Sequence, residues 1–435
     1  MIKLDYTKAR TSPVWMGWVL LALTLLGTVV AFVYLRGARQ SSVWMGPYLS
    51  GAANWKMGGE FLVDWDELKV YHDLSPTEQD AYRFHHSEHA TYYGANPVGY
   101  VYLIVLAKFM FPFAGDQTAI VLLQLTVHTL LCSWVFFSTA FKPVFKTGFL
   151  VLYALNPLIL GFAAYNHYYF WQAVPSFYVL YLWSERRASL GVVLTAAFAV
   201  GLALTARPTA ILLCPLAACL AARRFGWVSA LAVLFIIGGV MMAINRPMNK
   251  NVFHSVYIGV GAYANPDQIN LSDDDGYALY QKETGEKLVA SLGGNYYDKD
   301  VMDRYKQITR QRYFEILREH PVLLTRNAVL NIAQAFLLGY QTRRGDGLNY
   351  LVAGLGAAFA LGLAWRRAWF YLLVIPLATL TFTPYYPPIR AYMYGAYAFI
   401  VFALLCSLKA GGEGVGVKPA PGQKSDCQNP NPLAQ

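Results

Sequence analysis

Charged side chains are scarce in this chain of 435 residues. They make up 14% of it, whereas an ordinary globular domain has about 25%. Hydrophobic residues, by contrast, reach 56%. A soluble protein could not bury that much apolar surface, but a lipid bilayer accepts it directly. The composition therefore excludes an ordinary soluble domain and predicts an all-α, multi-pass membrane protein.

Cysteine is scarce as well, and its placement excludes further classes. Four of the five cysteines lie in apolar runs and the last lies in a polar tail: Cys132, Cys214, Cys219, Cys406 and Cys427. This argues against a disulfide framework and against a Cys-based metal site. The net charge of +10 comes without a basic patch with interleaved aromatic residues in a soluble region, so we expect no nucleic-acid partner. Basic loops that face anionic membrane lipid account for the charge.

Apolar runs long enough to be candidate transmembrane helices recur along residues 1–408. They fall at about 15–35, 97–114, 117–140, 147–163, 168–183, 189–206, 208–222, 227–244, 350–364, 367–383 and 391–408, with a weaker run at 323–340. From these runs we expect about 10–12 transmembrane helices. Two long polar stretches, 36–96 and 245–322, interrupt the runs. The polar tail 409–435 is expected to be disordered and cytoplasmic.

Short basic loops predict the orientation, because such loops stay in the cytoplasm. The basic positions are Lys3, Lys8, Arg10, Arg186, Arg187, Arg223, Arg224, Arg366 and Arg367. They predict a cytoplasmic N-terminus and two external loops. One conflict remains. The first loop is expected outside and Arg186 inside, so an odd number of membrane crossings must separate them. Four apolar runs, however, lie between them. The doubtful places are Phe141–Lys146 and Tyr165–Gln172.

The first loop contains candidate catalytic acids. Residues Tyr48–Phe61, YLSGAANWKMGGEF, have apolar residues at helical spacing and predict an amphipathic helix on the membrane surface, ended by Gly58 and Gly59. Tyr48 and Asn54 are expected to line a substrate site. Glu60, Asp64 and Asp66 follow or end this helix. Carboxyl groups near an apolar surface can have a raised pKa, which suits a general base. They could also hold a divalent cation, and the alternative is a solvated loop with a Trp anchor.

Other polar groups of the first loop give a weaker signal. His85 and His89 are four residues apart and would share a helical face, as zinc ligands do. No third ligand is indicated, so no metal residue is assigned.

Four arginines are candidates for binding a phosphate. Arg207 lies between two apolar runs, and an arginine there must face water, a phosphate or a carboxylate. On the same face we place Arg326, Arg343 and Arg390, whose guanidinium groups could fork onto a phosphate or diphosphate. The alternative for each is contact with lipid headgroups. The aromatic stretch Ala164–Gln172 is an interfacial belt or a lining of the site, and its candidate lining residues are Tyr168 and Trp171.

The sequence of the second loop indicates local secondary structure rather than catalytic residues. Ser272–Asp275, with three consecutive aspartates, is typical of a solvated turn or a helix N-cap. Tyr305–Glu319 has apolar residues at helical spacing and predicts an amphipathic helix ended by His320 and Pro321.

Three short segments resemble the GT-C superfamily of integral-membrane glycosyltransferases. They are the surface-helix sequence Tyr48–Phe61, the hairpin GLALTARPTAIL at Gly201–Leu212 and the late mouth Pro388–Tyr392. The resemblance implies a GT-C-like bundle with an acidic catalytic residue in the first loop. It also implies a polyprenyl-phosphate sugar donor and a protein or glycan acceptor. In many members an acid stands just before the helix tyrosine, whereas here Met45, Gly46 and Pro47 precede it. A narrower likeness is to pilin-modifying arabinofuranosyltransferases.

Two other functions remain open. An O-antigen ligase or polymerase also has a large late external loop with Arg and His, but its first loop is short. A lipid or solute transporter would carry charges inside its membrane helices and an internal repeat. Lys108 is the main candidate for such a charge.

Overall fold

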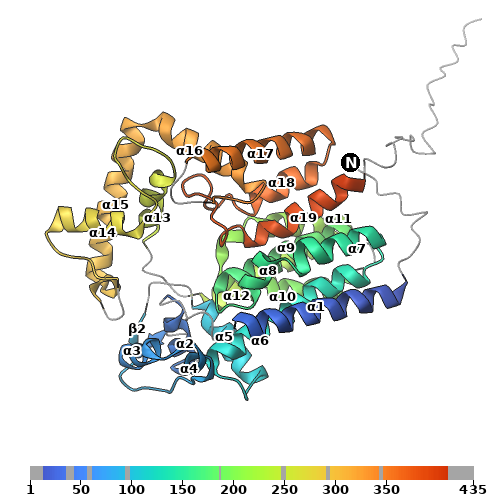
Figure 1. Ribbon diagram of the computed structural model, residues 1–435, viewed down its shortest axis with the longest axis horizontal. Helices are drawn as coiled ribbons and strands as arrows, with labels where there is room; N and C mark the ends of the chain where they lie inside the picture. The colour runs from blue at the N-terminus through green and yellow to red at the C-terminus, as the bar shows by residue number, and fades with distance from the viewer. Residues whose placement is uncertain are drawn as a thin grey trace, which may run out of the picture.

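The computed structural model describes residues 13–35, 44–55, 61–93, 98–185, 188–245, 251–290, 294–341 and 346–409. Helices dominate these residues, as expected (Figure 1). The segment between 44 and 93 contains α2 (Gly46–Ala53), β1 (Leu62–Val63), α3 (Trp65–Asp73), α4 (Pro76–Ala81) and β2 (Thr91–Tyr92). The two short strands pair antiparallel, with Leu62 opposite Tyr92.

The helical bundle is formed by segments before and after the two loops. Its elements are α1 (Val14–Leu35), α5 (Gly99–Met110), α6 (Asp116–Phe137), α7 (Pro143–Phe149), η1 (Leu150–Ala154), α8 (Pro157–Ala163), η2 (Tyr168–Gln172), α9 (Ala173–Ser184), α10 (Leu190–Ala206), η3 (Pro208–Ala210), α11 (Leu213–Phe225), α12 (Trp227–Ile244), α17 (Asp346–Trp365), α18 (Trp369–Leu377) and α19 (Tyr394–Lys409). The second loop adds α13 (Val252–Gly259), η4 (Val260–Ala262), α14 (Asp273–Thr284), η5 (Asn295–Tyr297), α15 (Lys299–Glu319) and α16 (Pro321–Ala335).

Several helices of the bundle could cross a membrane. Four in the described residues are long and apolar enough, namely α1, α6, α12 and α17, and α7 to α8 form a fifth candidate that bends by 59°. Their outward side chains are apolar: Val33 on α1 is 65% exposed and Phe235 on α12 is 81% exposed. Water would penalise such surfaces, whereas lipid tails accept them.

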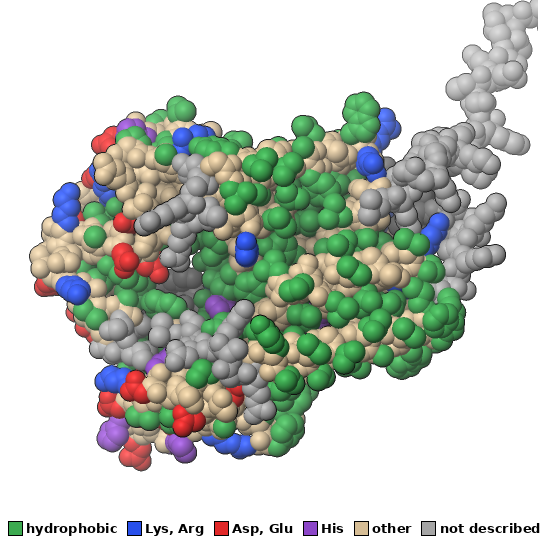
Figure 2. Space-filling model, in the orientation of Figure 1, with side chains coloured by type: hydrophobic (Ala, Val, Ile, Leu, Met, Phe, Trp, Pro, Cys, Tyr) green, Lys and Arg blue, Asp and Glu red, His purple; other side chains and the backbone are tan. Residues whose placement is uncertain are grey.

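Both loops lie at the same end of the bundle. In Figure 1 the helices α2 to α4 and α13 to α15 occupy the left end, one group below the other. In Figure 2 the acidic side chains visible on this face gather at that end, while apolar side chains cover the bundle. Arg223 lies in the last turn of α11, and Arg366 directly follows α17. Both loops thus lie at one end of the bundle, and the side of the membrane that this end faces stays a prediction.

The helix α5 bears on the conflict over the number of crossings. Its first residue Gly99 lies against Thr205 at the end of α10. Its other end lies near the first loop, because Lys108 pairs with Asp116 at 2.9 Å and Asp116 accepts a hydrogen bond from the Phe84 amide at 3.0 Å. With 12 residues, α5 is not among the helices of the described residues that are long and apolar enough to cross a membrane. The bent pair α7 and α8 is either a broken span or a re-entrant loop, so the number of crossings before Arg186 stays a prediction.

The helix α2 also differs from expectation. It ends at Ala53, before Gly58, and protein buries every residue from Gly46 to Ala52. An amphipathic surface helix would leave one face exposed. The prediction was wrong because the small residues of α2 let α5, α3 and β1 approach closely; a methyl group added at Gly51, for instance, would meet the Phe61 ring.

The local predictions for the second loop are confirmed. Ser272 caps α14, its side chain accepting a hydrogen bond from the Asp274 amide. The helix α15 includes the predicted Tyr305–Glu319 and ends before His320, where Pro321 starts α16. The predicted hairpin is found as well, since α10 ends at Ala206 and α11 starts at Leu213.

Candidate functional site

Arg207 owes its position to the proline that follows it. A residue before proline avoids the helical region, and Arg207 is extended, with φ −147° and ψ 99°. The helix α10 therefore stops at Ala206, and η3 begins at Pro208. The turn is tied to the late segment of the chain because the Thr381 hydroxyl donates to the Thr209 carbonyl at 2.7 Å.

Tyrosine rings surround the Arg207 guanidinium. Its central carbon lies 4.6 Å from the centroid of Tyr169, 4.7 Å from that of Tyr392 and 5.1 Å from that of Tyr168. The Tyr168 ring in turn lies 5.8 Å from Tyr48. We call these five residues the Arg207 cluster. Cation–π contacts stabilise a guanidinium held in this way.

The charge of Arg207 is buried without an ionic partner in the described part of the chain. The residue is 8% exposed, and its Nε donates to no acceptor there. The ion pairs formed between described residues do not include it. A buried cation is costly unless it is paired. The arrangement therefore suits an anionic ligand.

A neutral histidine lies beside the cluster. His167 stacks on Tyr169, with ring centroids 4.2 Å apart. Burial, and secondarily the positive charge of Arg207, lower the pKa of His167 to about 3. Its Nδ1 accepts a hydrogen bond from the Tyr169 amide at 3.3 Å. His167 is thus uncharged near neutral pH and adds no positive charge to the cluster.

The cluster joins the three segments that carry the GT-C resemblance. Tyr48 comes from the first, Arg207 from the second and Tyr392 from the third. Gln172 fixes the third segment, since its buried side-chain amide donates to the Ala391 carbonyl at 3.0 Å. On the other side, the Tyr100 ring packs edge-to-face on Tyr48 at 5.3 Å.

Asp64 acts as a helix cap. Its Oδ1 accepts hydrogen bonds from the amides of Asp66 and Glu67, both at 3.0 Å. A hydrogen bond from Ser87, followed by these amides, lowers the pKa of Asp64. The expected rise in pKa is therefore not found at this carboxyl group, because capping bonds favour its ionised form.

Asp66 does not join the Arg207 cluster. The Asp66 side chain is 93% exposed and pairs with Lys69 at 2.9 Å. Glu60 lies outside the described residues, but its neighbour Phe61 contacts Tyr48 with ring centroids 5.2 Å apart. A fourth acid, Glu67, pairs with His85 at 2.9 Å. His85 and His89 lie outside any helix, so the helical spacing considered for them does not apply.

Two predicted lining residues have other contacts. Asn54 is fully buried at the end of α2, where its Oδ1 accepts from the Ser87 amide at 2.8 Å and its Nδ2 donates to the Ser50 carbonyl at 3.0 Å. It therefore holds the first loop together. Trp171 is 5% exposed and packs on Phe170.

Arg390 and Arg326, two of the other predicted arginines, lie outside the cluster. Arg390 is exposed, two residues before Tyr392, and donates to the Gln341 side-chain oxygen at 2.7 Å. Arg326 is on α16 and donates to the Ala264 carbonyl at 3.0 Å. Arg343 lies outside the described residues.

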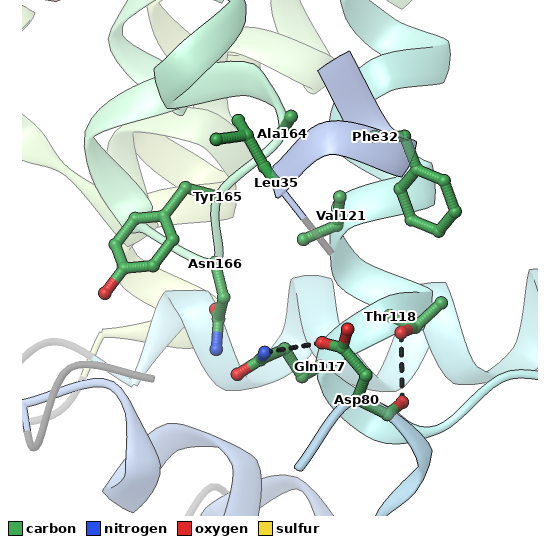
Figure 3. Close-up of a pocket in the computed structure, with 9 residues that line it drawn as sticks. All are labelled: Phe32, Leu35, Asp80, Gln117, Thr118, Val121, Ala164, Tyr165 and Asn166. Atoms are coloured by element: carbon green, nitrogen blue, oxygen red, sulfur yellow. Dashed lines mark hydrogen bonds between the residues drawn. The ribbon is translucent and has the colours of Figure 1, made fainter. Parts of the chain in front are cut away.

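A small polar cavity lies beside the cluster, between the first loop and the bundle. It measures about 20 Å³ and is lined by residues that include Asp80, Gln117 and Asn166. Asp80 and Gln117 approach it from one side and Asn166 from the other, with Gln117 donating to the Asp80 carboxylate (Figure 3). The Asn166 Oδ1 accepts from the Tyr100 hydroxyl at 2.8 Å. The cavity has room for about one water molecule and joins the first loop to Tyr100.

No group of three or more metal-ligating side chains occurs among the described residues, so a divalent cation stays a prediction. Comparisons with protein families, curated proteins and solved structures found no match to this chain.

Sequence reasoning missed Tyr169, His167 and Gln172 as parts of the site. A signal was present, since all three lie in the aromatic stretch that was singled out. Their order along the chain could not show which rings face Arg207, because η2 is a 3-10 helix and projects its side chains with a different period from an α-helix.

Proposed function

We propose that the chain is a membrane glycosyltransferase. It transfers a sugar from a polyprenyl-phosphate donor to a protein or glycan acceptor on the external face of a bacterial inner membrane. The observation that supports this most is Arg207, a buried guanidinium surrounded by tyrosines, with no carboxylate partner in the described residues. The phosphodiester of the donor provides the missing negative charge, and tyrosine rings suit a sugar or a prenyl chain.

The path of the chain supports a multi-pass topology. If α5 stays on the external side, the helices that run between the two ends are α1, α6, α7 with α8, α9, α10, α11, α12, α17, α18 and α19. This topology belongs to the proposal, since only the longer of these helices meet the usual length for a span. It places the Arg207 cluster near the outer leaflet, where the phosphate of a lipid donor would lie.

The proposed reaction is a displacement at the anomeric carbon. The acceptor hydroxyl oxygen bonds to that carbon on the face opposite the phosphate, and the bond from carbon to phosphate oxygen breaks. The polyprenyl phosphate leaves with the bonding electrons, and the hydroxyl proton passes to a carboxylate. Arg207 stabilises the second negative charge that develops on the leaving phosphate.

Glu60 is the preferred candidate for the carboxylate. Its chain neighbour Phe61 contacts Tyr48, whereas Asp64 is engaged as a cap and Asp66 pairs with Lys69. A Glu60→Gln variant that keeps full transfer activity would remove this assignment.

The proposal is tested by mass spectrometry of surface glycoconjugates and proteins. Cells with the intact gene, without it and with Arg207→Gln are compared, and Arg318→Gln serves as an exposed arginine control. We expect one glycan to disappear in the deletion and in Arg207→Gln but to remain in the control. Identical glycans in all four strains would reject the glycosyltransferase function.

The alternatives make different predictions. An O-antigen ligase would use a diphosphate-linked oligosaccharide rather than a monophosphate sugar. Chemical identification of the purified donor distinguishes the two. A transporter would move substrate across vesicles without forming a glycosidic bond. Its main support in the sequence is weakened, because Lys108 stands at a helix end in an ion pair with Asp116.

A further inference from the structure

The helix α16 is inverted in polarity. Its polar residues Asn327, Asn331 and Gln334 are at most 4% exposed, whereas Val322 is 81% and Val329 is 61% exposed. The three buried amides donate inward, to the carbonyls of Val260, Thr383 and Asn349. A helix in water shows the opposite pattern. The outer face of α16 therefore suits lipid rather than water.

This outer face is hollowed. A shallow depression of about 450 Å³ is lined by Pro321, Val322, Thr325, Arg326, Val329 and Leu330. The helix packs against α17, one of the helices long and apolar enough to cross a membrane. The helix that carries the depression thus packs on a part of the bundle that is apolar enough for contact with lipid.

Arg326 places a positive charge at the edge of this apolar depression. Its Nη2 and Nε donate to the Ala264 carbonyl and to Asn327 Oδ1. Among the described residues no acceptor takes the Nη1 hydrogens and no carboxylate pairs with the group. The guanidinium is therefore held in place with one nitrogen available to an anion.

Arg326 is separate from the Arg207 cluster. It lies over the Tyr263 ring at 5.9 Å, and Tyr263 packs with Tyr386 in a small core of its own. Tyr386 then contacts Tyr392, the outer ring of the Arg207 cluster. Aromatic side chains thus lie between Arg326 and the Arg207 cluster.

We propose that the depression beside Arg326 binds one anionic membrane phospholipid, with an acyl chain along Val322 and Val329 and the phosphate on the guanidinium. An apolar surface with a fixed cation at its edge matches the two parts of such a lipid. The site requires that the protein lies in a membrane, but it does not require sugar transfer.

The test uses full-length protein in phosphatidylcholine vesicles that contain a lipid with a photoreactive acyl chain. The photoreactive lipid is either phosphatidylglycerol or phosphatidylcholine, and labelled peptides are mapped by mass spectrometry. We expect the peptide containing residues 321–330 to be labelled about fivefold more by phosphatidylglycerol, the effect of one interfacial cation. Peptides of α1 should be labelled equally by both lipids, which reports membrane insertion.

Variants separate a specific site from general attraction. Arg326→Gln should abolish the preference for phosphatidylglycerol, Arg326→Lys should keep most of it and Arg318→Gln should leave it intact. The proposal is overturned if 321–330 stays unlabelled while α1 is labelled, if both lipids label it equally in the unmodified protein, or if Arg318→Gln acts like Arg326→Gln. Because no step measures sugar transfer, failure here leaves the glycosyltransferase proposal untouched.

Discussion

The guanidinium of Arg207 lies 4.7 Å from the ring of Tyr392, and it is the meeting point of the hairpin after α10 and the turn before α19. Two further contacts hold this arrangement: Gln172 bonds the Ala391 carbonyl and Thr381 bonds the Thr209 carbonyl. The site is therefore fixed by hydrogen bonds to backbone carbonyls, while no carboxylate among the described residues pairs with the charge of Arg207.

Replacement of Arg207 should lower activity more than stability. Arg207→Gln removes the charge that stabilises the leaving phosphate, and we expect kcat/KM for transfer from a polyprenyl-phosphate sugar to fall roughly 100-fold. Arg207→Lys keeps the positive charge but loses the two parallel N–H groups of the guanidinium, so its kcat/KM should fall less. The measurement is transfer in reconstituted vesicles, with Arg318→Gln as control. Unchanged kcat/KM in Arg207→Gln would contradict a phosphate role.

Asp64 should prove to be a cap rather than a base. Asp64→Ala removes the acceptor for two amides of α3 and should lower the free energy of unfolding by about 1 kcal/mol. Asp64→Ser keeps a capping oxygen without a carboxylate, so it should preserve both stability and transfer activity. A stable Asp64→Ser protein that transfers no sugar would instead identify Asp64 as the base.

The lowered pKa of Asp64 gives this prediction a pH dependence. The folded state favours the ionised carboxyl group, so its stabilising effect is present above the ordinary pKa of about 4. It is lost as the pH falls through the lower, folded-state pKa. The difference in thermal unfolding between the original protein and Asp64→Ala should therefore shrink in acid.

Protonation of His167 in the unfolded chain should lower the free energy of unfolding as the pH falls from neutral. The unfolded chain binds a proton near the ordinary pKa of about 6.5, whereas the folded protein resists protonation until about pH 3. Stability is therefore greatest above 6.5 and falls by about 1 kcal/mol for the first unit below it. Thermal unfolding measured between pH 7 and 5 should therefore show a smaller loss of stability in His167→Gln than in the original protein. An equal decline in both proteins would show that His167 is not protonated on unfolding.

The path of α5 can be checked with single cysteines in a cysteine-free protein. Phe113→Cys, in the turn after α5, should react with a membrane-impermeant maleimide from the same side as His86→Cys in the first loop. Lys142→Cys, beyond α6, should react from the opposite side. Labelling of Phe113→Cys from the side opposite to His86→Cys, with Lys142→Cys labelled from the same side as His86→Cys, would mean that α5 crosses after all.

The sequence predicted most elements because they depend on local pattern. The apolar runs become helices, Ser272 caps α14, and Pro208 ends α10 before Arg207. These outcomes follow from residues close together along the chain.

The sequence was less informative where contacts between residues far apart in the chain determine the position of a segment. The run 97–114 has the composition of a span, but its helix α5 has only 12 residues, and Lys108 near its end pairs with Asp116, which accepts a hydrogen bond from the Phe84 amide of the first loop. The helix α2 resembles a surface helix in sequence, yet other elements enclose it. Within the site, Arg207, Tyr48 and Tyr168 were predicted and meet, whereas Asn54 was assigned to substrate because a buried amide in a cap looks the same in sequence as one in a binding site.

Gly99 shows that a residue without a functional group can control the chemistry of the site. A methyl group there would come within 2.2 Å of the Thr205 carbonyl carbon, so any side chain would push α5 away from α10. Tyr100, next in the chain, supports Tyr48, and Thr205 lies two residues before Arg207. The spacing between the rings and the guanidinium is therefore set by direct contact of two backbones. A search for catalytic residues among polar side chains alone would miss this position.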